Sequence, residues 1–211
     1  MVDVPSRGYQ PIENYGIIGD LYTVALMGMD GSIDFMAFPH FDSPTVFAAL
    51  LDWQKGGRFQ IAPRPIDARQ KQLYLPDSNI LLTRFLASDG VAEISDCMPV
   101  AEVEQAHNLV RRVKTVRGEI GFRMVCAPCF DYGRASHRVE QRDGEVLFFL
   151  RGPTASSCAC VPPCRSASRM AMPSRSSPCG PMNNQPDGSA LARIAARHGA
   201  GVSHRLPGLS L

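Results

Sequence analysis

The segment Cys126-Ala127-Pro128-Cys129 has the spacing most able to do chemistry in this sequence. A C-x-x-C pair exchanges disulfides where a helix N-terminus lowers a thiol pKa, and two such pairs with the right spacing bind zinc. Here the pair ends a strand-like run, so coincidence is the favoured interpretation. Four later cysteines also match no familiar zinc site: Cys158, Cys160, Cys164 and Cys179. We expect no metal site and no cofactor.

His40 is the single histidine of most interest, in the segment PHFDSP at residues 39–44. Two interpretations are open. The ring lines a cleft toward another domain, or it is a polar loop residue beside a helix start, which we favour. The other histidines have no ligand spacing: His107, His137, His198 and His204.

The acidic residues provide no pair that we can assign to acid–base catalysis. Those in the most distinctive segments fall in turns or strands: Asp34, Asp42 and Asp131. For Asp34 and Asp42 we expect Asx-type turn bonds, and for Phe41 loop packing. The basic residues Arg111, Arg112 and Lys114 are expected to form a solvated strand face and not a nucleic-acid site. No catalytic, cofactor-binding or metal-binding residue is therefore assigned.

The elements that must position these residues are predicted to be antiparallel strands. Short apolar runs are separated by turns, three of which contain Asp-Gly, the dipeptide that favours tight hairpins. No long helical pattern separates the runs, so a β-sandwich is favoured over βαβ units. The four expected hairpins join residues 22–27 with 32–38, 80–86 with 91–96, 109–116 with 120–125, and 137–141 with 145–150.

One short helix is expected after residue 42. Ser43 can cap its N-terminus, Pro44 suits its first position, and Gly56-Gly57 would end it. Its apolar stripe would consist of Val46, Phe47, Leu50 and Leu51. We expect this helix to cover one end of the sandwich.

The composition changes abruptly near residue 151. All 16 aromatic residues lie at or before Phe149, whereas residues 152–211 hold six arginines, one acidic residue and four of the seven cysteines. A segment of this kind lacks the side chains to build a core. We therefore divide the chain into an N-terminal arm (1–11), an all-β sandwich domain (12–151) and a disordered, low-complexity tail (152–211).

The tail also has the composition of a GC-rich gene translated out of frame. In the alternative frame, three outputs are forced, because the codons of Met170, Met172 and Met182 with those that follow give Gly, Ala and Glu. With suitable free bases that frame permits an alternating string containing VPLRIENGDAVA, which continues the strand pattern. A one-base slip near codons 149–153 is our hypothesis.

The segment IENYGIIGDLYTVALMGMDGSIDFMAFPHFDSPTVFAALLD, at residues 12–52, resembles the N-terminal domain of bacterial glycoside hydrolase family 15 proteins. These are trehalase-like and glucoamylase-like enzymes. Phe35 stands where the family usually has Trp, and His40 where Arg is common. The resemblance covers residues 10–151 and includes GGRFQIAP at 56–63, DCMP at 96–99 and FDYG at 130–133.

The resemblance implies a β-supersandwich that precedes an (α/α)6 barrel, and the barrel carries the paired glutamates of an inverting glycosidase. The expected function is thus that of a truncated, non-catalytic domain. It would support hydrolysis of α-glucosidic bonds in the full-length enzyme, with the barrel as partner. The alternative is a standalone β-sandwich that binds carbohydrate or protein. No nucleic acid or membrane is expected, and the reduced thiols and absent signal sequence favour the cytoplasm.

Overall fold

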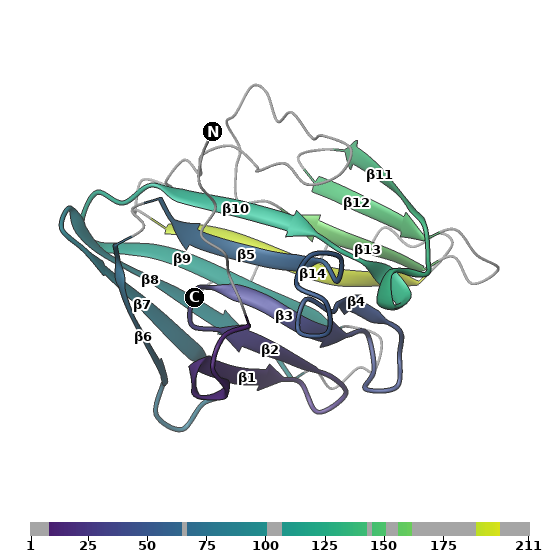
Figure 1. The fold of residues 1–211 in the computed structure, drawn as a ribbon, viewed down its shortest axis with the longest axis horizontal. Coiled ribbons are helices and arrows are strands. Elements are labelled where there is room, and N and C mark those ends of the chain that lie inside the picture. Colours follow the sequence, from purple (N-terminus) through teal and green to yellow (C-terminus); the bar gives the residue numbers. More distant parts are fainter. Residues whose placement is uncertain are drawn as a thin grey trace.

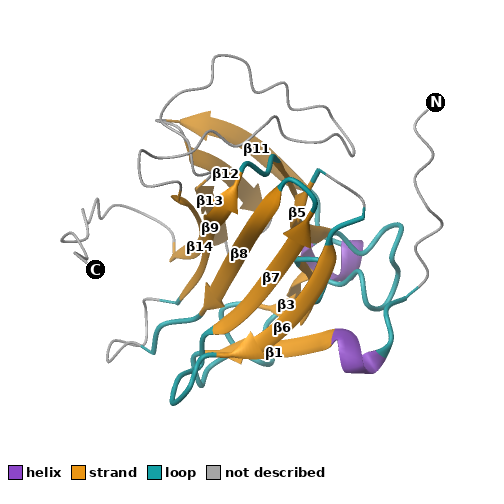
Figure 2. Cartoon of the chain, turned by 90° about the vertical axis from the view of Figure 1, so that its left-hand side faces the viewer, coloured by secondary structure: helices purple, strands orange, loops and turns teal. Residues whose placement is uncertain are grey.

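The computed structural model describes residues 9–64, 67–100, 107–142, 145–150, 156–161 and 189–198. In these residues two antiparallel sheets pack face to face (Figure 1). This all-β architecture confirms the predicted fold class. The view turned by 90° shows the strands of the larger sheet side by side (Figure 2).

The smaller sheet has six strands, in the order β1-β2-β3-β5-β10, with β4 paired to β3. Its strands are β1 (Tyr15–Gly19), β2 (Val24–Gly28), β3 (Ser32–Ala37), β4 (Thr45–Phe47), β5 (Arg58–Pro63) and β10 (Phe122–Ala127). A 3-10 helix, η1 (Ile12–Asn14), leads into β1, and another, η2 (Phe130–Gly133), follows β10.

The larger sheet has eight strands, in the order β11-β12-β13-β14-β9-β8-β7-β6. These are β6 (Arg69–Tyr74), β7 (Leu81–Ala87), β8 (Gly90–Cys97), β9 (Asn108–Gly118), β11 (His137–Arg142), β12 (Glu145–Leu150), β13 (Ser156–Val161) and β14 (Ser189–His198).

The core lies between the sheets, and strands such as β1, β5 and β8 contribute alternate residues to it. Along β8, for example, buried and half-buried residues alternate over its whole length. Phe85 of β7 and Phe122 of β10 meet across the core with ring centroids 6.0 Å apart, and Phe47 and Phe59 pair at 6.4 Å. Burying such rings supplies much of the apolar contact that holds the two sheets together.

Three of the four expected hairpins are confirmed: β2–β3, β7–β8 and β11–β12. The hairpin expected from residues 109–116 and 120–125 is wrong. β9 ends at Gly118 in the larger sheet, and the chain then crosses to the smaller sheet, where β10 pairs with β5. Apolar alternation identifies a strand and its buried face. It does not identify the partner, and Ile120 and Phe122 enter the core from the opposite side.

The helix expected after Ser43 is also wrong, because its first part is strand β4. Four consecutive residues, Val46 to Ala49, are at most 4% exposed, whereas an amphipathic helix buries one face. The Thr45 hydroxyl accepts a hydrogen bond from the Tyr132 amide at 3.0 Å, which fixes this strand beside η2. One turn follows, with the Leu51 amide 2.9 Å from the Ala48 carbonyl.

Two segments of the predicted tail lie in the larger sheet. β13 pairs with β12, β14 pairs with β13 and β9, and the Ile194 side chain is 1% exposed in the core. The expectation that the tail shares no core with the sandwich is therefore wrong at Ile194. The open edges of β9 and β12 explain this difference, because unpaired backbone groups favour an added strand. The rest of residues 152–211 lie outside the described residues.

Candidate functional site

An open depression lies where the loop after β4 covers the outer face of the smaller sheet. Its volume is about 280 Å³. The side chains that give it chemical character are Tyr15, Asp30, Asp34, Trp53, Arg58 and Gln70. Asp34 is the extra residue of a β-bulge on β3, because the pairing with β2 steps from Ile33 to Phe35, and its side chain lines the depression. The depression thus collects groups from four strands and two loops.

Hydrogen bonds hold both carboxylates of the depression. Asp30 accepts bonds from the amides of Gln10 at 2.8 Å and Gln60 at 2.7 Å, and from the Ser32 hydroxyl at 2.7 Å. Asp34 accepts a bond from the Tyr15 hydroxyl at 2.9 Å. The carboxylates are therefore fixed in position by neutral donors.

Burial dominates the titration of this site. Asp34 is 9% exposed, and desolvation raises the pKa of its carboxyl group; the nearby Asp30 charge raises it further, against the Tyr15 hydrogen bond. Burial, followed by the charge of Asp34, also raises the pKa of Tyr15, so this phenol remains a hydrogen-bond donor at neutral pH. No ion pair to Asp34 is found among the described residues.

Replacing Asp34 by asparagine is expected to change how the stability of the chain depends on pH. Because the folded-state pKa is raised, the folded state binds the Asp34 proton more tightly than the unfolded state. The contribution of Asp34 to stability is thus present below the ordinary value of 3.8 and falls as pH rises through the folded-state pKa.

Urea unfolding of the unchanged chain and of Asp34→Asn, measured from about pH 3 to about pH 8, checks this expectation. The variant should gain stability relative to the unchanged chain as pH rises. Parallel pH profiles of the two chains would contradict it.

Trp53 and Arg58 form the aromatic side of the depression. The Arg58 guanidinium donates a hydrogen bond to the Trp53 carbonyl oxygen at 2.6 Å and lies 6.0 Å from the centre of the indole ring. This contact ties the loop after β4 to the first residue of β5. It also places the depression's one guanidinium beside its two carboxylates.

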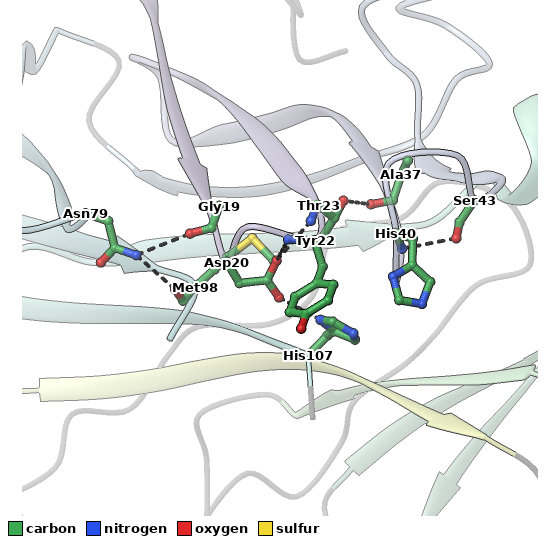
Figure 3. A network of polar contacts seen from close by, with 10 residues as sticks. All are labelled: Gly19, Asp20, Tyr22, Thr23, Ala37, His40, Ser43, Asn79, Met98 and His107. Carbon is green, nitrogen blue, oxygen red and sulfur yellow. Dashed lines mark hydrogen bonds and ion pairs between the residues drawn. The ribbon is translucent and has the colours of Figure 1, made fainter. Parts of the chain in front are cut away.

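A second polar cluster contains His40 and His107, which no pattern in the sequence places together (Figure 3). His107 Nδ1 lies 2.7 Å from Asp20 Oδ2, and both side chains are buried. The His40 and Tyr22 rings each lie 5.1 Å from the His107 ring. His40 is exposed, which agrees with its predicted place in a loop, and it covers His107. The Nε2 atom of His107 is buried and has no hydrogen-bond partner among the residues that the structure describes.

Within the described part of the chain, neither C-x-x-C cysteine forms a disulfide bond. Burial raises the pKa of Cys129, and the charge of Asp52 raises it further, which is opposite to the shift that activates a nucleophilic thiol. Among the residues that the structure describes, no group of three or more histidine, cysteine or acidic side chains is placed to hold a metal ion. The cysteines of the tail lie outside the side chains described.

Two expectations on single residues are wrong. Arg111 is 0% exposed, although it was expected on a solvated face; it lies on the same face of β9 as Leu109 and Val113 and pairs with Asp96. Phe41 is 61% exposed and does not pack into its loop.

The other residues considered in the sequence lie on the surface or beside aromatic rings. Asp131 pairs with Arg134 at 2.7 Å on the surface, and His137 packs between the rings of Phe130 and Phe148. No described helix is long and apolar enough to cross a membrane.

The chain belongs to the trehalase-like, N-terminal family, whose model matches residues 6–155. It is similar to Trehalase 1 of Sulfolobus acidocaldarius (36% identical; 72% of this chain, 24% of the relative). It is also similar to trehalases of Thermoplasma volcanium (31%; 69% and 24%) and Mycolicibacterium smegmatis (30%; 61% and 22%). The chain thus spans about a quarter of the length of these curated relatives. No solved structure matches it significantly.

Proposed function

We propose that this chain is the non-catalytic N-terminal domain of a glycoside hydrolase family 15 protein, which supports hydrolysis of α-glucosidic bonds such as those of trehalose. The observation that carries the proposal is the extent of the similarity. It covers residues 6–155 here and about a quarter of each trehalase. The remaining three quarters of such an enzyme can contain the catalytic carboxylates.

The carboxylates of the depression support a role other than bond cleavage. An inverting glycosidase needs one carboxylic acid that protonates the leaving group and one carboxylate that activates water. Both oxygens of Asp30 accept bonds from glutamine side chains of the chain itself, and one oxygen of Asp34 accepts the Tyr15 hydroxyl. A carboxylate that already accepts these bonds is poorly placed to take a proton from water.

The partner in this proposal is an (α/α)6 barrel of the same enzyme, in the cytoplasm. Two exposed aromatic side chains are candidates for the contact: Phe41, in the loop before β4, is 61% exposed, and Tyr132, in η2, is 50% exposed. Thr45 of β4 accepts a hydrogen bond from the Tyr132 amide. Exposed apolar side chains favour association with another protein surface.

We further propose that residues after about 151 are translated from a slipped frame. The aromatic-free composition of residues 152–211 and the glycine, alanine and glutamate that the alternative frame forces support this proposal. With suitable free bases, the alternative frame also permits strand-like alternation after β12.

Two measurements test these proposals: the DNA sequence downstream of codon 145, and an assay of trehalose hydrolysis. We expect the first part of a barrel-coding sequence, in another frame, within about 600 bases, which is the coding length of one domain of about 200 residues. The 211-residue chain should release no glucose from trehalose, whereas the protein made from the restored frame should release it.

Measurable turnover by the 211-residue chain would refute the non-catalytic role. An unrelated gene downstream, in every frame, would favour the alternative of a standalone binding module. A tail shared by other family members in the printed frame would refute the frame slip without affecting the family assignment.

A further inference from the structure

We propose that the depression around Trp53 binds one ring of an uncharged saccharide. The site contains an indole, two carboxylates, a guanidinium and two glutamine amides on one open surface. Saccharide rings present hydroxyl groups at their edges and C–H groups on their faces, and this lining offers partners for both. The inference rests on the proposed function for the choice of sugars that are tested.

The polar lining retains hydrogen-bonding capacity for a ligand. Gln10 donates one amide hydrogen to Asp30, which leaves its second hydrogen and its carbonyl oxygen. Gln70 lies on the exposed edge strand β6, and its side-chain amide makes no hydrogen bond within the described part of the chain. The Asp34 carboxylate accepts the Tyr15 hydroxyl and interacts with the Ser32 side chain, and its remaining lone pairs can accept from a ligand hydroxyl. These groups match hydroxyls, which both donate and accept.

The charge of the site selects against anions. The lining contains two carboxylates, Asp30 and Asp34, and one guanidinium, that of Arg58. The charge of Asp30 acts on the Asp34 carboxylate. A phosphate on the ligand would add charge of the same sign as the excess. We therefore expect neutral sugars to bind and phosphorylated sugars to be excluded.

The volume of the depression limits the size of the ligand. About 280 Å³ is at the lower end of the range of small-molecule sites, so one sugar ring fits while the rest of a longer saccharide stays outside. Strand residues and connecting segments line the depression, which is open and not an enclosed cavity. An open site that holds one ring suits the end of a disaccharide or oligosaccharide.

Trp53 is the only tryptophan in the chain, so intrinsic fluorescence reports directly on this site. The 211-residue chain would be titrated with trehalose, glucose and glucose 6-phosphate. We expect a saturable change with the two neutral sugars and none with the phosphate. Asp34→Asn and Gln70→Ala should each weaken binding about tenfold, as expected for a lost hydrogen bond in a polar site.

Asp131→Asn is the matched control, because it removes a carboxylate outside the depression and should leave the titration unchanged. Gln70 is exposed on an edge strand, so its replacement keeps the fold even if Asp34→Asn does not. No saturable change with trehalose or glucose, equal affinity for glucose 6-phosphate, or unchanged affinity in Gln70→Ala would overturn the proposal. Binding without any turnover would leave the non-catalytic role intact, whereas turnover by the chain would refute that role and not the site.

Discussion

Replacing Asp96 by asparagine is expected to lower the free energy of unfolding by about 3–5 kcal/mol, because it leaves a buried guanidinium without its counter-charge. Asp96 Oδ1 lies 2.8 Å from Arg111 Nε, and both side chains are 0% exposed. The rest of the guanidinium donates to the carbonyls of Gly31 at 2.8 Å and Phe59 at 3.2 Å, and it lies 4.9 Å from the Phe59 ring centre. Arg111 therefore connects the two sheets through the core.

A matched control lies on the neighbouring strands. Arg84 and Glu93 are direct cross-strand partners on β7 and β8, as Asp96 and Arg111 are on β8 and β9. Arg84 is 44% exposed, so Glu93→Gln should cost less than about 1 kcal/mol. Urea unfolding of both variants at neutral pH checks the difference.

A double variant separates the charge from the packing. Replacing Asp96 by leucine together with Arg111 by methionine removes both charges, and we expect it to recover much of the stability lost in Asp96→Asn. Equal losses in Asp96→Asn and Glu93→Gln would contradict the role assigned to the buried pair.

The place of Arg111 could have been predicted from the sequence, but its partner could not. Leu109, Arg111 and Val113 alternate with Val110, Arg112 and Lys114, so the pleat puts Arg111 on the apolar face. The usual preference of arginine for solvent led to the opposite expectation. Asp96 lies 15 residues away, and its register with Arg111 depends on how β8 and β9 pair.

Local turns were predictable, whereas contacts between distant segments were not. The Asp-Gly dipeptides located three true hairpins, since turn geometry depends on adjacent residues. β9 and β10 are also adjacent, but they lie in different sheets. Whether two consecutive strands form a hairpin or lie in different sheets depends on the side of the core on which the second strand packs. The apolar alternation of that strand is the same in either case.

The residues that form the candidate sites could be predicted from the sequence even less well, because they come from distant segments. Asp20 and His107 are 87 residues apart, and the depression draws on residues between Tyr9 and Gln70. No spacing rule links such positions. The single tryptophan, Trp53, gave no hint of the depression, because it fell inside the helix that Gly56-Gly57 was expected to end. The polar partners of Asp30 and Asp34 could be found only from the fold.

Replacing Gly31 by alanine is expected to lower the free energy of unfolding by about 3 kcal/mol, which combines the cost of a left-handed residue with a displaced backbone. Gly31 has a φ of 78°, and an added Cβ would lie 2.1 Å from the Ile61 carbonyl oxygen. That oxygen belongs to β5 and is held in the sheet by pairing with β10. The neighbouring strand therefore has to move, because no side chain can rotate away.

Gly121→Ala is the control, since an added Cβ there meets the flexible Arg64 side chain at 3.2 Å and the backbone does not have a positive φ. Its cost should stay within about 0.5 kcal/mol. The Gly31 carbonyl accepts the Arg111 guanidinium, so moving this turn also weakens the buried ion pair. The losses from Gly31→Ala and Asp96→Asn should thus sum to more than the loss in the double variant, because the two changes disturb one network. Strictly additive losses would show that the β2–β3 turn and the Arg111 network are independent.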